Sequence, residues 1–82
     1  MTTTASRFDF TPPEDDMVDA EYTLKDCPRF AVQVFAHGGR TTYHVNEYGG
    51  EGDDFWMKDH GGFNRKGGAM LYAIFLAETV DA

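Results

Sequence analysis

The sequence contains little of what builds disulfide frameworks, membrane spans or secretion signals. Cys27 is the single cysteine, so no disulfide can form within the chain and nothing calls for an oxidising compartment. The longest apolar run, AMLYAIFLA at 69–77, is about half as long as the ~20 residues that a membrane-spanning helix needs. The first ten residues, MTTTASRFDF, contain no apolar signal-peptide segment. We therefore expect a cytoplasmic protein that does not enter a membrane.

Positive charge is also scarce. Lysine and arginine total 7 against 14 aspartate and glutamate, which leaves a formal net charge of −7. Such a chain is repelled by the phosphates of nucleic acids and of anionic membranes, and it suits a basic partner. Acidic charge that serves solubility alone is the competing explanation. The partner that the charge favours is a basic protein or nucleoprotein complex, bound without direct contact to nucleic acid.

Motifs for catalysis or cofactor binding are lacking as well. The glycine pairs that start at 38, 49, 61 and 67 follow neither the GxGxxG nor the GxxxxGKS pattern. The best metal or catalytic candidates are His44, His60 and Asp59, but no spaced His-x-His or Cys-x-x-Cys pattern supports them. We expect a non-enzymatic protein with no catalytic residue, metal or cofactor. A small metal-dependent enzyme that uses these three residues is the alternative from a different class.

A chain of 82 residues, of which 41% are hydrophobic and 15% aromatic, supports one domain with one core. We therefore treat 1–82 as a single domain. Residues 1–6 contain only Thr, Ser and Ala after the first Met, with nothing to bury, and we expect them to be disordered.

The segment RFAVQVFAHGGRTTYHVNEY at 29–48 has the strongest pattern in the chain. Two alternating runs are joined by Gly38 and Gly39, which tolerate the positive φ of a tight hairpin turn. If these two residues form the loop, facing positions sum to 77, so that Val32 faces Val45. One face of the hairpin is then mostly apolar and the other mostly polar, as in an antiparallel sheet that is covered on one side.

Four further elements are predicted around this hairpin. They are a short helix at about 12–20 with Thr11 as N-cap and Glu14 completing a capping box, a brief edge strand at 21–25, a third main strand within 53–59, and a C-terminal helix at about 65–80 with Asn64 as N-cap. Two facings stay open for the third strand: Trp56 is buried, or a β-bulge buries Phe55 and Met57 instead. The fold class is α+β: an antiparallel sheet of three strands, four with the edge strand, a C-terminal helix on one face and a short N-terminal helix.

The predicted C-terminal helix is apolar on two sides. Met70, Ile74 and Ala77 form the stripe expected to lie on the sheet. A second side contains Tyr72, Phe75 and Leu76, and it needs a cover. Either the N-terminal segment with Phe8, Phe10, Met17 and Val18 folds over it, or it is a homodimer or partner interface.

The carboxylates are unevenly distributed, and they form the candidate partner-binding surface. One group lies at 14–26 and a second spans the loop before the third strand: Glu14, Asp15, Asp16, Asp19, Glu21, Asp26, Glu47, Glu51, Asp53 and Asp54. Duplex DNA carries one negative charge per ~1.7 Å of axis, and carboxylates at comparable density can occupy a Lys/Arg groove built for nucleic acid. A solvated acidic face is the simpler alternative.

This combination of a very short, strongly acidic chain with a small antiparallel sheet, one main helix and no catalytic motif resembles, in type, the small inhibitors encoded by bacteriophages and mobile elements. These include anti-CRISPR proteins and anti-restriction DNA mimics. The resemblance implies an inhibitor that binds a host defence complex at its nucleic-acid-binding surface, in the cytoplasm of the host cell. A small homodimeric interaction protein that associates through the C-terminal helix is the second hypothesis.

Overall fold

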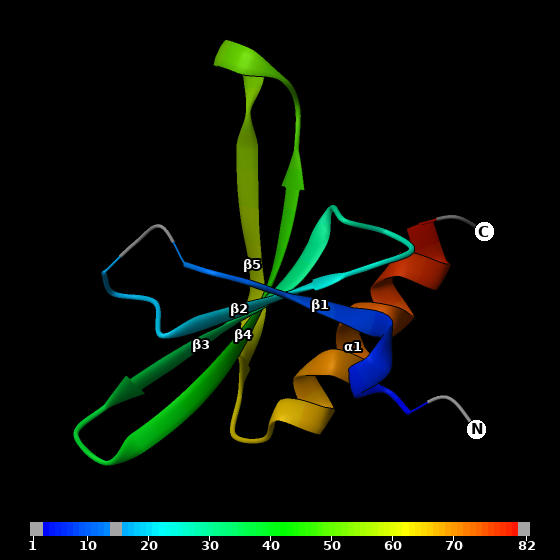
Figure 1. Cartoon of the computed structure of the whole chain (residues 1–82). Coiled ribbons are helices and arrows are strands. Elements are labelled where there is room, and N and C mark those ends of the chain that lie inside the picture. The colour runs from blue at the N-terminus through cyan, green and yellow to red at the C-terminus, as the bar shows by residue number, and fades with distance from the viewer. Residues whose placement is uncertain (1–2, 14–15, 81–82) are drawn as a thin grey trace.

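An antiparallel sheet of five strands with one helix packed against it makes up the part of the chain that the structure describes, residues 3–13 and 16–80 of a computed structural model (Figure 1). The strands follow one another in the sheet in chain order, so every neighbouring pair is a simple antiparallel connection. The elements are the 3-10 turn η1 (Ala5–Arg7), β1 (Phe8–Thr11), β2 (Ala20–Leu24), β3 (Phe30–His37), β4 (Arg40–Gly49), the 3-10 turn η2 (Gly52–Asp54), β5 (Trp56–Phe63) and α1 (Lys66–Val80).

The central hairpin is confirmed in its predicted register. Val32 pairs with Val45 and Val34 pairs with Tyr43 across β3 and β4. Gly38 and Gly39 both have positive φ, 58° and 77°, as a two-residue turn between twisted strands requires. Because side chains alternate along a strand, this register decides which residues of both strands lie under the helix.

The sheet is larger than predicted because β1 adds a strand at its edge. The predicted edge strand at 21–25 is found as β2, but it lies inside the sheet, between β1 and β3. In β1, Phe8 faces Leu24 and Phe10 faces Tyr22. These four residues are too few to give a clear alternating pattern, which is why the sequence does not predict β1.

The predicted N-terminal helix at 12–20 is wrong. The residues expected at the C-terminal end of that helix belong to the sheet instead. The Asp19 N–H donates to the Val34 carbonyl at 2.8 Å, and β2 starts at Ala20. Before it, residues 16 and 17 form a turn, and Glu14, the capping-box residue, lies outside the described residues. The backbone hydrogen bonds of the sheet outweigh the local helix-start signal of Thr11 and Pro12.

The third main strand is present, but later in the chain than predicted, as β5. The loop before it contains η2, and the ladder begins where Trp56 pairs with Gly49 and shifts register between His44 and Asn46. Phe55, Trp56 and Met57 are all exposed, so both predicted facings are wrong. Figure 1 shows the reason: the β4–β5 hairpin projects at the top of the view beyond the end of the helix, so that α1 does not lie over it there.

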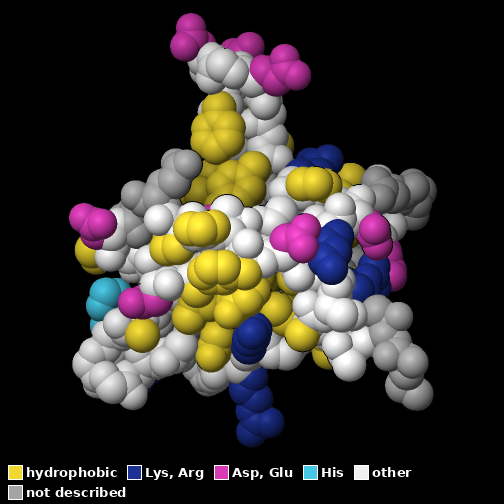
Figure 2. Space-filling model, viewed as in Figure 1, with side chains coloured by type: hydrophobic (Ala, Val, Ile, Leu, Met, Phe, Trp, Pro, Cys, Tyr) yellow, Lys and Arg dark blue, Asp and Glu magenta, His cyan; other side chains and the backbone are white. Residues whose placement is uncertain are grey.

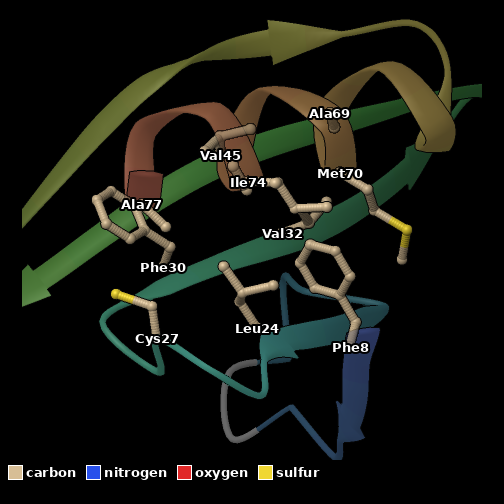
Figure 3. Packing of buried hydrophobic residues seen from close by; sticks show 11 residues of the cluster. Phe8, Leu24, Cys27, Phe30, Val32, Val45, Ala69, Met70, Ile74 and Ala77 are labelled. Carbon is tan, nitrogen blue, oxygen red and sulfur yellow. The ribbon is translucent and has the colours of Figure 1, made fainter. Parts of the chain in front are cut away.

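The core lies between the sheet and α1. Phe30, Val32 and Val45 have no exposed surface, and they pack with the helix stripe of Met70, Ile74 and Ala77 that the sequence predicts (Figure 3). Ala69 and Ala73 are small residues on the same stripe and are also fully buried, which brings the helix backbone close to the sheet. From the other strands, Phe8 and Leu24 complete the cluster.

The second apolar side of α1 is covered in part, and not by the N-terminal segment: Tyr72 and Leu76 are half-buried against the core cluster, whereas Phe75 is exposed. Phe8 enters the core, whereas Phe10 and Met17 are exposed and Val18 is buried away from the helix, where it lines a hollow on the other face of the sheet. The N-terminal segment therefore does not fold over this side.

Within the described part of the chain no helix is long and apolar enough to cross a membrane.

The two valines of β3 offer a matched test of this core. Val32→Ala removes apolar volume from a fully buried site and is expected to lower the free energy of unfolding by about 2 kcal/mol, since both transfer energy and a cavity are involved. Val34→Ala removes the same atoms from a half-buried position and should cost less than half as much. Chemical denaturation of both variants measures the difference, and equal losses would contradict the packing of Val32 under the helix.

Candidate functional site

The sheet has one covered face and one open face. Alternation places Phe30, Val32 and Val45 beneath α1, so their neighbours Gln33, His44 and Asn46 belong to the opposite, open face. In Figure 1, α1 lies on one side of the strands and the β1–β2 connection lies on the other. The molecule is flat, with extents of 39 × 38 × 20 Å, so these two faces make up most of its surface.

A hollow of about 510 Å³ lies on the open face, between the β1–β2 connection and the base of the projecting hairpin. Its walls are mainly apolar, with four side chains that carry a polar group among them; the lining residues are Thr11, Pro12, Pro13, Val18, Glu21, Gln33, Tyr48, Phe55 and Met57. A smaller hollow of about 180 Å³ shares Gln33 and Met57 with it and extends to Phe35, His44, Asn46 and Asp59. The two together form a shallow groove across the strands.

Tyr48 and Glu21 place an aromatic ring and a carboxylate side by side in this groove. The Tyr48 hydroxyl donates to Glu21 Oε1 at 3.2 Å, and the Tyr48 ring stacks with Phe55 at 6.1 Å between centroids. Burial and the charge of Glu21 raise the pKa of Tyr48 above its ordinary value of 10.0, so the hydroxyl stays protonated and keeps donating. Beside this pair, Asn46 Nδ2 donates to Gln33 Oε1 at 2.5 Å, which satisfies a buried amide.

The structure does not bring together the three residues of the metal or enzyme hypothesis. His44 and Asp59 are neighbours on the open face, with His44 Nδ1 and Asp59 Oδ2 3.1 Å apart. His60 lies against the core instead, where its ring is 6.3 Å from that of Phe30 and its Nε2 is 2.8 Å from Glu47 Oε1. Among residues 3–13 and 16–80 no cluster of three or more His, Cys, Asp or Glu side chains could hold a metal ion.

Most of the predicted acidic residues that the structure describes border the groove or the hairpin beyond it. Asp16 and Asp19 lie on either side of Val18 in the β1–β2 connection, where Asp19 Oδ2 accepts a hydrogen bond from the Ala36 N–H at 2.7 Å, and Glu21 lines the groove. The tip of the β4–β5 hairpin adds three more acidic residues just before Phe55 (Figure 2). Asp59, which the sequence suggested only as a metal ligand, borders the smaller hollow. We call this set the acidic rim: Asp16, Asp19, Glu21, Glu51, Asp53, Asp54 and Asp59.

Two predicted members of the acidic surface lie elsewhere. Asp26 is in the β2–β3 connection, where its carboxylate is 3.8 Å from Arg7. Glu47 is only 8% exposed and binds Arg29 and His60 on the covered side of the sheet, so it is a structural residue and not part of an exposed acidic surface. Glu14 and Asp15 lie outside the described residues.

Within the described part of the molecule the acidic rim has no lysine or arginine partner, and its one contact with an imidazole is that of Asp59 with His44, which is an ion pair only when His44 is protonated. Arg7, Lys25 and Arg29 each pair with a carboxylate that is not in the rim: Asp26, Asp9 and Glu47 respectively. Across residues 3–13 and 16–80, no lysine or arginine forms an ion pair with a rim carboxylate. Apart from Asp59, the rim is therefore a region of unpaired negative charge, and Figure 2 shows its hairpin acids at the top of the view, apart from most of the lysine and arginine side chains.

Comparison with protein-family models, with curated proteins and with solved structures finds no match.

The groove itself could not be found from the sequence, because it is formed by β1, by the loop after it and by the late start of β5, all of which the pattern misplaced. The pairing of Tyr48 with Glu21 had one usable signal. Tyr48 lies on the polar face of the predicted hairpin, where an aromatic residue is unusual.

Glu47 offers a test of whether its carboxylate is structural. Burial would raise its pKa, but hydrogen bonds from His60 and Arg29 and their positive charges outweigh burial, so the pKa lies below the ordinary value of 4.5. A lowered folded-state pKa means that the carboxylate stabilises the fold fully above the unfolded-state pKa. This stabilisation is lost as the pH falls through the folded-state value.

Glu47→Gln should lower the free energy of unfolding by about 2 kcal/mol at neutral pH, because it leaves Arg29 and His60 without their charged acceptor. The difference from the unchanged protein should shrink as the pH drops below 4.5. Denaturation series across that pH range measure it. Glu51→Gln, at the exposed hairpin tip, is the control and should be neutral; a Glu47 effect that does not change with pH would contradict this role.

Proposed function

We propose that this protein acts without catalysis, by binding through its open face and acidic rim to a basic protein surface that otherwise binds nucleic acid. The observation that supports this most is that no lysine or arginine pairs with the rim within the described chain, beside a groove lined by the half-buried Tyr48 and the exposed Phe55 and Met57. An acidic face that serves solubility alone would need no apolar groove beside it. Side chains that only fill the core would not be exposed as Phe55 and Met57 are.

The groove and the rim have different parts in this proposal. Rim carboxylates attract lysine and arginine over several ångströms and orient the approach, as phosphates do in DNA. The groove then supplies short-range contacts: the face of Phe55 or Tyr48 can stack on an arginine guanidinium, and the second oxygen of Glu21 can accept a hydrogen bond from it. The charge of the rim raises the rate at which the two proteins associate, and burial of the groove in the complex slows their dissociation.

The class of partner follows from the resemblance to small inhibitors of phages and mobile elements. Under this proposal the protein occupies the nucleic-acid-binding surface of a host defence complex, such as a CRISPR effector or a restriction enzyme. Occupancy alone explains how such a small chain with no assembled catalytic constellation in its described part could act. It would work in the cytoplasm of the host, where these complexes are found.

The hairpin tip allows a charge test that leaves the fold intact. Asp53 and Asp54 are exposed, and their side chains make no hydrogen bond or ion pair within the described chain. Replacing both with lysine should weaken binding to the proteins retained from a lysate of defence-competent bacteria by more than about tenfold. The matched control reverses Asp26 and Glu78, two exposed carboxylates that lie outside the rim and off the open face, for an equal change in net charge, and it should weaken binding by less than about threefold. Equal losses in both variants would mean that net charge, and not the rim, determines binding.

Competition with DNA tests the mimicry separately. A short DNA duplex added to the immobilised complex should displace the retained protein, because both ligands would occupy the same basic site. Binding should also weaken steeply as salt is raised from about 50 to about 200 mM, as it does for proteins that make several phosphate contacts. Retention that is indifferent to duplex DNA would show that the partner's nucleic-acid site is not the target.

A further inference from the structure

The outer side of α1 has an uncovered apolar stripe. Five residues at the three- and four-residue spacing of a helix lie opposite the buried stripe; we call them the outer stripe, and they are Gly68, Leu71, Tyr72, Phe75 and Thr79. Leu71 is 58% exposed and Phe75 is 59% exposed, and apolar side chains that lie together on an exposed surface often mark an interaction site. Tyr72 connects the stripe to the core, because its ring is 5.4 Å from Phe63 and 6.2 Å from Phe75.

Gly68 is an unfavourable residue for its position. Glycine is less favourable than alanine inside a helix, and Gly68 lies in the first turns of α1, on an exposed side. A methyl group there would meet only Phe63, at an ordinary contact distance of 3.8 Å. Nothing within the described chain therefore requires the absence of a side chain at 68. A surface that approaches from outside would give Gly68 a reason, because it leaves a notch in the stripe.

The stripe is complementary to itself. Gly68 and Phe75 lie at equal distances in sequence on either side of the pair Leu71 and Tyr72. If a second α1 packs antiparallel across the first about a twofold axis at this pair, Phe75 of each copy lies over Gly68 of the other. Leu71 of one copy then meets Tyr72 of the other. A twofold arrangement requires that the notch and the projection lie at equal distances from the axis, as Gly68 and Phe75 do. A partner of unrelated sequence would not require this spacing.

The charges favour the same arrangement. The stripe has no carboxylate, and it lies on the covered side of the sheet, away from the acidic rim, so two chains of net charge −7 repel each other least when they meet there. Antiparallel packing also places the exposed Arg65, at the start of one helix, near the end of the other helix, where the helix dipole is negative; Lys66 instead lies over the Tyr22 ring of its own chain, 4.1 Å from its centroid.

We propose that the protein forms a symmetric homodimer through the outer stripe of α1, with Phe75 of each copy in the notch above Gly68 of the other. The open face and the acidic rim stay outside this interface. The dimer is therefore independent of the proposed function, and it would present two rims to partners.

The neighbouring glycines provide a matched pair of variants. Gly67 and Gly68 are both helical, and both should gain helix stability from alanine, but Gly67 lies to the side of the outer stripe, where a methyl group would meet nothing. Sedimentation equilibrium over a concentration series gives the dimer dissociation constant. Gly68→Ala should raise this constant by about tenfold or more, because the notch is filled, whereas Gly67→Ala should change it by less than about threefold. Thermal unfolding at concentrations below dissociation should show both variants at least as stable as the unchanged chain.

Phe75→Ala is the second test, because it removes the projection from an exposed site and leaves the core intact. It should also raise the dissociation constant by about tenfold or more, with an unchanged circular dichroism spectrum. A strict monomer at the highest concentrations reached would overturn the proposal. So would a dimer that responds equally to alanine at 67 and 68, since its interface would then lie elsewhere.

Discussion

The pairing of Val32 with Val45 across the β3–β4 hairpin is the constraint on which the rest of the structure depends. Both side chains have no exposed surface and lie under α1, so the helix rests on one face of the sheet. A slip by one residue would expose these valines and bury Gln33 and His44 in their place. The two positive-φ glycines of the turn prevent that slip, because only a loop of two residues produces this register. Because the helix covers one face only, the open face, with its apolar groove and its acidic rim, is left accessible to a partner.

The sequence patterns that predict the fold correctly are those in which several local signals agree. The β3–β4 hairpin has alternation on both strands and a glycine pair at its centre, and α1 has an apolar stripe of regular spacing, so both can be predicted with their buried residues. The failures occur where one signal stands alone. Thr11 and Pro12 resemble a helix start, yet Thr11 is the last residue of β1. At the other end of the predicted helix, Asp19 and Ala20 are hydrogen-bonded to or part of the sheet. At Trp56 composition suggests burial, but burial depends on where the helix ends, which local pattern does not contain.

The candidate site shows the same division. Charge composition alone indicates an acidic surface, and six of the ten predicted carboxylates lie together in the acidic rim. Glu47 was misplaced because its neighbours in space, Arg29 and His60, are 18 and 13 residues away and neutralise it on the covered face. Asp59 was not predicted as part of the acidic surface. It pairs with Asn46 beside a register shift in the β4–β5 ladder, and this places it at the groove. A groove is a product of three-dimensional arrangement, and no residue pattern in this chain indicates it.

A flat molecule with an acidic, grooved face on one side and an apolar helix on the other separates two kinds of contact. We expect the open face to meet a basic partner and the outer stripe to meet a second copy. The most direct measurement of the first contact is hydrogen–deuterium exchange of the protein alone and in complex with its partner. Binding through the open face should add protection in the β1–β2 connection and at the β4–β5 hairpin. Protection confined to α1, with the hairpin exchanging as it does in the free protein, would contradict it.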